Sequence, residues 1–228
     1  MRHDVRLAQA VAAVLRLLGR RRWPSVRSGP ELADFLAAQT AYVAQRSVIE
    51  YCKARTGLNW DKLYAEQMFL ERLEVCRWEA YAIVLAEVAE LALIRLRRGG
   101  AADPQSVLPG LVAAAHAALL RHPVPSHRST WTDAAEAIEP HLARALLAEP
   151  RPVHVLGFQS ADAIFDLLPI HADLRPEDRE MFQNSVRFAI CGVFDAMTRS
   201  FDVPALEAAL VSSAGEQTAA PPSGPGAS

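Results

Sequence analysis

The chain has 228 residues and a formal net charge of −2, and 51% of its residues are hydrophobic. This length can bury a core without disulfides or metal ions, and the composition excludes a disordered, a collagen-like or a uniformly basic, nucleic-acid-coating protein. Alanine accounts for 41 residues, and because alanine has the highest helix propensity, the composition favours a helical protein.

The cysteines and the N-terminal residues bear on the cellular compartment. Cys52, Cys76 and Cys191 form no CxxC pair and no even set for a disulfide framework. The apolar residues at the N-terminus follow helical spacing, unlike a signal peptide, and the longest apolar window is residues 107–120. A membrane span needs roughly 18 to 20 apolar residues. We therefore expect a cytoplasmic protein that crosses no membrane.

Residues 1–30 form a predicted basic arm, with seven Arg and one Asp. Apolar residues recur at helical spacing from Val5 to Leu18, and the cations near the end of this predicted helix are Arg16, Arg20, Arg21 and Arg22. The favoured interpretation is that these arginines stabilise the helix dipole or contact the acidic body of the protein. Binding of nucleic acid or of an anionic membrane surface through them is a less favoured alternative.

A long helical hairpin is predicted over residues 31–98. Between Glu31 and Asp103 there is no proline, and glycine occurs only at 57, 99 and 100. This pattern predicts two long helices joined at residues 56–61, with Asn59 or Asp61 as the N-cap of the second helix. We expect the second helix to end near Arg98.

Prolines return after residue 104 and divide the rest of the chain into shorter helices. We predict these helices at residues 106–121, 132–148, 160–168, 175–200 and 203–213, with Ser160 and Asp202 as N-caps. Pro140 is expected to kink or end its helix, and the strand-like residues 153–156 have no sheet to join. The predicted fold is an all-α helical bundle, one domain over residues 31–211, followed by a disordered tail over residues 212–228.

Common catalytic motifs are missing from the sequence, which contains no GxSxG, no GxxxxGK[ST] and no HExxH. A di-iron site of the ferritin type needs Glu-x-x-His pairs, and no histidine follows a glutamate by three residues. Asp162, Asp166, His171 and Asp173 are interpreted as an exposed acidic segment rather than a metal site. We therefore predict no catalytic residues, metal or cofactor.

Polar residues interrupt the faces of the hairpin that should be apolar. Gln39, Arg46, Glu50 and Lys53 share one face of the first helix, and Glu66, Arg77 and Arg95 interrupt the apolar row of the second helix, with Glu74 at its edge. If the hairpin closes near residue 58, opposite charges meet across it. The favoured interpretation is a set of interhelical salt bridges that hold the hairpin in register, and the alternative is a polar pocket or a subunit contact.

Large aromatic residues gather on the same helix, including Trp60 and Trp78, and binding hot spots are rich in aromatic residues and arginine. The candidate ligand-binding or interface residues are Arg46, Glu50, Lys53, Glu66, Glu74, Arg77, Trp60 and Trp78.

The leading functional hypothesis is a non-enzymatic protein that binds another protein or itself, as an assembly factor, adaptor or regulatory subunit. In the first alternative, the bundle binds a small amphipathic molecule, with Arg46, Lys53 and Arg77 receiving its anionic head. In the second, it is an unfamiliar enzyme that uses Glu50 and Glu66 as acid and base or as metal ligands.

Overall fold

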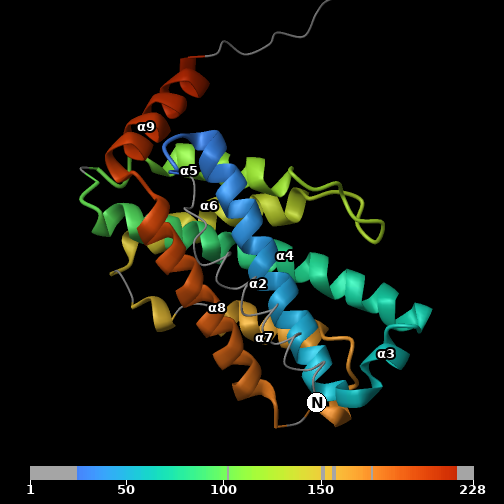
Figure 1. The fold of residues 1–228 in the computed structure, drawn as a ribbon. Coiled ribbons are helices and arrows are strands. Elements are labelled where there is room, and N and C mark those ends of the chain that lie inside the picture. Colours follow the sequence, from blue (N-terminus) through green and yellow to red (C-terminus); the bar gives the residue numbers. More distant parts are fainter. Residues whose placement is uncertain (1–24, 102, 150–151, 156–157, 176, 220–228) are drawn as a thin grey trace, which may run out of the picture.

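The computed structural model describes residues 25–101, 103–149, 152–155, 158–175 and 177–219. The fold of these residues is an all-α helical bundle, as predicted (Figure 1). Their only β-type pairing is an isolated parallel bridge between Val26 and Phe201. None of the described helices combines the length and the hydropathy that a membrane span requires. The predicted arm helix and the arginines at 16, 20, 21 and 22 lie outside the described residues.

Eight α-helices and three short 3-10 turns make up the described chain. In order they are α2 (Gly29–Thr56), η1 (Gly57–Asn59), α3 (Trp60–Leu63), α4 (Gln67–Arg98), α5 (Leu108–Leu119), α6 (Thr132–Leu147), η2 (Val153–Val155), α7 (Phe158–Leu167), η3 (Ala172–Leu174), α8 (Arg179–Ser200) and α9 (Val203–Ala219). Helix α4 contacts α2, α5, α6, α7 and α8, so it is the centre of the bundle. Figure 1 shows α2 crossing in front of α4.

Local sequence signals set both ends of α2. The hydroxyl of Ser28 accepts a hydrogen bond from the backbone N–H of Glu31, and Pro30 occupies the first turn, where a missing N–H costs little. The helix ends at Gly57, whose φ of 51° lies in the left-handed region that glycine adopts without strain.

The link between the two long helices is longer than predicted. Helix α4 begins at Gln67 rather than near residue 61, and neither Asn59 nor Asp61 caps it. The intervening residues form η1 and α3, where the rings of Trp60 and Tyr64 lie 3.8 Å apart and both approach Phe69. This aromatic packing stabilises a compact turn where helix propensity alone favours a continuous helix.

Two capping predictions have different outcomes. Asp202 accepts a hydrogen bond from the backbone N–H of Ala205 at 3.5 Å, which confirms it as the N-cap of α9. Ser160 is not an N-cap, because it lies inside α7 and its hydroxyl and backbone N–H both donate to Glu87 on α4. A glutamate from another helix therefore replaces the local cap.

Three further predictions concern the second half of the chain. Helix α6 does not end at Pro140 but continues through it, although proline has no backbone N–H to donate to the helix. Residues 153–155, the strand-like segment without a sheet to join, form a 3-10 turn. Helix α9 extends to Ala219, so residues 212–219 are helical rather than part of a disordered tail, and residues 220–228 lie outside the described chain.

Helices α5 and α9 cross at Gly110. A Cβ atom at this position would lie 2.4 Å from the carbonyl oxygen of Leu210 on α9, closer than any real contact of this kind. The absence of a side chain at Gly110 therefore allows the two backbones to approach.

We expect Gly110→Ala to destabilise the protein by about 1–3 kcal/mol, because overpacking forces the helices apart. The matched control is Gly192→Ala on α8, where an added Cβ meets nothing within 4 Å. Since alanine is the better helix former, this control should gain about 0.5–1 kcal/mol. Urea denaturation measures both values, and equal effects of the two substitutions would contradict close packing at the crossing.

Candidate functional site

On α2, the predicted site residues point to solvent. Arg46, Glu50 and Lys53 are exposed, and Gln39 is buried. The guanidinium of Arg46 lies over the ring of Tyr42 and donates a hydrogen bond to its hydroxyl. The ammonium of Lys53 lies 5.4 Å from the ring centroid of Trp60, so the structure brings these two predicted residues together.

Glu66, the N-cap residue of α4, and Glu74 within this helix are exposed, and Arg77 and Trp78 are half-buried. The predicted salt bridges of the hairpin do not form. Among the described residues, no ion pair joins α2 to α4. The side of α2 that packs into the bundle carries uncharged residues such as Val43, Ser47 and Val48. Arg46, Glu50 and Lys53 consequently stay in water.

Three glutamates of α4, at positions 79, 87 and 90, find partners on later segments of the chain instead. Arg128, between α5 and α6, donates from Nε and Nη2 to both oxygens of Glu79, at 2.6 and 2.5 Å. These hydrogen bonds hold the pKa of Glu79 below its ordinary value, and His127 adds a contact at 2.8 Å. Arg128 also pairs with Asp133 at 2.7 Å and lies over the ring of Trp131. This cluster fixes the loop between α5 and α6 on α4.

Two more glutamates tie α4 to α6 and α7. Glu87 accepts hydrogen bonds from the hydroxyl and the backbone N–H of Ser160, and Glu90 lies 2.8 Å from Nε2 of His141. Burial raises the pKa of Glu87, against the opposing effect of the hydrogen bonds from Ser160. Within the described chain, no three His, Cys, Asp or Glu side chains lie close enough to hold a metal ion.

The acidic residues at the end of α7 form ion pairs with α8. Asp162 and Asp166 each accept a hydrogen bond from Arg179 on α8, both at 2.6 Å. The guanidinium of Arg179 stacks on the ring of Phe165, 4.7 Å from its centroid. These carboxylates therefore join α7 to α8.

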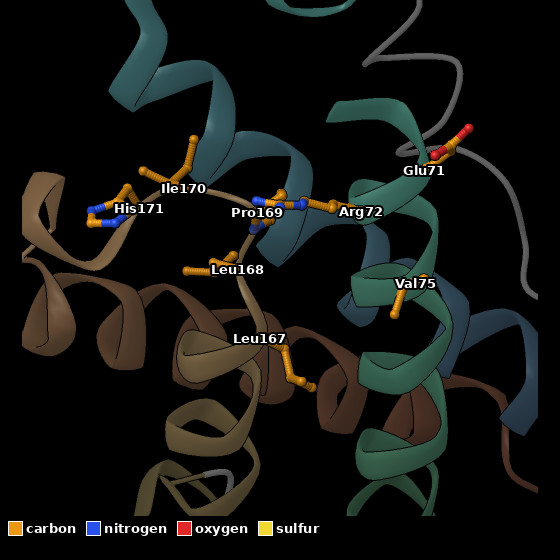
Figure 2. Close-up of a pocket in the computed structure, with 8 residues that line it drawn as sticks. All are labelled: Glu71, Arg72, Val75, Leu167, Leu168, Pro169, Ile170 and His171. Atoms are coloured by element: carbon orange, nitrogen blue, oxygen red, sulfur yellow. The ribbon is translucent and has the colours of Figure 1, made fainter. Parts of the chain in front are cut away.

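An open groove of about 340 Å³ lies between α4 and the segment that follows α7. One wall is formed by Glu71, Arg72 and Val75 of α4, and the other by residues 167–171. Figure 2 shows Val75 and Leu167 pointing toward each other and the side chain of Arg72 extending across the groove toward Pro169. Glu71 is turned away from the groove.

The groove is lined mainly by apolar groups and continues into an exposed apolar surface. Leu168 and Ile170 are buried beneath it, whereas Val75 and Leu167 are 36% and 39% exposed. Met68, one helical turn before Arg72 on the same side of α4, is 65% exposed. Such a concentration of accessible apolar side chains next to a groove is typical of an interaction site.

The two charged residues of α4 at the groove, Glu71 and Arg72, do not pair with each other. Glu71 accepts a hydrogen bond from Gln67 at 2.9 Å. Arg72 is exposed and has no ion-pair or hydrogen-bond partner among the described residues. The groove therefore presents one unpaired cation beside its apolar lining.

Sequence reasoning missed this groove because it followed the apolar row of α4 that faces α2. Met68, Arg72 and Val75 form a second row at spacings of four and three, on the other side of the helix. This spacing was a visible signal. The apolar residues around Pro169 were also visible in the sequence, but nothing in it places them opposite this row.

The chain matches no protein-family model, no curated protein and no solved structure at the level of significance required. The groove, the buried carboxylates and the residues of the hairpin are therefore the features from which a function is inferred.

A pH dependence follows from Glu87. Because burial raises its pKa above the ordinary value of 4.5, the folded protein holds this proton to higher pH than the unfolded chain does. The stability that Glu87 contributes is thus complete below 4.5 and is lost as the pH rises through the folded pKa. Glu87→Gln is neutral throughout, so we expect its melting temperature to fall less than that of the wild type as the pH rises from 4.5 to neutrality.

The control for this comparison is Glu139→Gln on the exposed side of α6, which should follow the wild-type curve. Thermal unfolding followed by circular dichroism over this pH range provides the measurement. Parallel curves for Glu87→Gln and the wild type would contradict a raised pKa.

Proposed function

We propose that the protein acts by binding a partner protein in the groove between α4 and residues 167–171, as an adaptor, assembly factor or regulatory subunit. The observation that supports this function is the open apolar groove with exposed Met68, Val75 and Leu167 around it. The proposed occupant is an amphipathic helix of the partner, which places apolar side chains in the groove and an acidic residue beside Arg72.

The dimensions of the groove favour such an occupant. A volume of about 340 Å³ accepts a few apolar side chains, and the open shape leaves room for the helix backbone above them. The unpaired guanidinium of Arg72 extends across the groove (Figure 2) and suits a carboxylate on the occupant. Apolar anchors with a charged contact at the edge are the usual anatomy of a protein interface.

Two alternatives have less support from the positions of the residues. Arg46 and Lys53 are exposed on α2, and the recess beside Arg77 has a volume of only about 20 Å³, too small for an amphipathic molecule. Glu50 and Glu66 are both exposed and line neither this recess nor the groove, so their positions give no support to a shared site for acid and base catalysis.

Site-specific crosslinking tests this proposal. A photo-crosslinking amino acid at position 75, introduced in cells of the source organism, should capture one defined partner. The same group at position 147 on α6 is the control, since Leu147 is 82% exposed and does not line the groove. The partner identified by mass spectrometry is then purified for binding measurements.

With the purified partner, we expect Val75→Glu and Leu167→Asp to weaken binding by about 2 kcal/mol each, roughly 30-fold in Kd. Arg72→Glu should also weaken binding, and the loss should be larger at low salt than at high salt, because the contact is electrostatic. Leu147→Asp should bind as the wild type does. Equal capture at positions 75 and 147, or a partner whose affinity does not depend on Val75 and Leu167, contradicts the proposal. Crosslinks to a second copy of the chain would identify self-association instead.

A further inference from the structure

A small, partly open recess lies between α2 and α4, on a different side of α4 from the groove. Arg77, Trp78 and Tyr81 of α4 line it together with Gln45 and two alanines of α2 and with His122, which follows α5. The rings of Trp78 and Tyr81 pack against His122, with centroids 5.3 and 5.0 Å from it. These contacts hold the lining residues in place without filling the recess.

Arg77 has no partner for its charge within the described chain. The side chain is half-buried, its Nε is buried without a hydrogen-bond partner, and no ion pair or hydrogen bond involves its guanidinium. Glu74, one turn earlier on α4, is exposed and forms no ion pair with it. A partly buried cation without a counter-charge is unfavourable, since burial removes part of its hydration.

The other polar groups of the recess are hydrogen-bond donors or can become so. Gln45, Trp78 and His122 have no hydrogen-bond partners among the described residues, and their amide, indole and imidazole N–H groups can all donate. The hydroxyl of Tyr81 is already used, since it donates to the carbonyl of Ala118 at 2.9 Å. No aspartate or glutamate contributes to the lining. The recess therefore has donors and a positive charge, and it lacks a negative one.

We propose that this recess binds a small oxyanion, a carboxylate or a phosphate, with the guanidinium of Arg77 as the principal donor. The volume of about 20 Å³ accepts about one water-sized atom, which corresponds to one oxygen of an anionic group whose other atoms lie at the open side of the recess. Arginine suits this role because its planar guanidinium donates two parallel hydrogen bonds to such groups. Gln45 and His122 offer the anion further N–H donors. This site is independent of the proposed protein-binding groove.

Titration calorimetry with inorganic phosphate and with acetate, at an ionic strength held constant with chloride, tests the proposal on the full chain. The wild type should bind one of the two anions at a single site, and the anion that binds distinguishes phosphate from carboxylate. Arg77→Gln should weaken this binding at least tenfold. The matched control is Arg95→Gln, a half-buried arginine in the same row of α4 whose Nε also lacks a partner but which does not line the recess. It should bind as the wild type does.

Gln45→Glu keeps the test decisive if Arg77→Gln fails to fold, because Gln45 is exposed and its substitution disturbs no packing. This variant places a carboxylate of the chain beside Arg77, so it should raise the melting temperature without added anion and abolish binding of the external anion. Binding that is unchanged in both Arg77→Gln and Gln45→Glu would show an adventitious ion only, and absence of binding of either anion to the wild type would overturn the site.

Discussion

Burial of α4 on almost all sides is the constraint on which the rest of the bundle depends. From Val84 to Leu96 most of its residues are buried, and five other helices contact it. Because little of this part of α4 faces water, its carboxylates are stabilised by polar partners within the protein, although the Nε of Arg95 has none among the described residues. Glu87 and Glu90 are satisfied by Ser160 and His141, and Arg97 donates to the last carbonyls of α6.

The residues of α4 that bind Arg128, His141 and the end of α6 lie on one side of the helix, opposite the apolar row that faces α2. Along that side, residues 68, 72, 75, 79, 83, 86, 90 and 97 follow one another at near-heptad spacing. From Glu79 onward, Arg128, α6 and α7 cover this row. From Met68 to Val75 it lacks such cover, and the groove forms there (Figure 2). The groove is thus the uncovered end of this side of α4. From Glu79 onward, hydrogen bonds hold other segments of the chain against the same side.

The sequence was sufficient to predict the fold class and the two long helices, because alanine-rich segments without proline and glycine have strong local preferences. It also allowed the N-cap at Asp202 to be predicted. It did not reveal the partners of Glu79, Glu87 and Glu90, which lie some 50 to 70 residues away along the chain. The expected salt bridges of the hairpin failed for the same reason. The hairpin prediction pairs the charges of two helices that are adjacent in sequence. In the structure, the three glutamates of α4 pair instead with segments that follow much later in the chain.

The candidate site illustrates the same limit. Arg77 and Trp78 were identified from their positions on the hairpin, and they do lie together in one recess. The opposing wall of the groove, residues 167–171, depends on how α7 packs on α4, which no local pattern records. The two features nevertheless share one helix. At about 100° per residue, the lining residues of the recess and of the groove are centred about a third of a turn apart around α4. Because they open on different sides of one rigid helix, a partner in the groove and an anion beside Arg77 can be bound at the same time without competing for space.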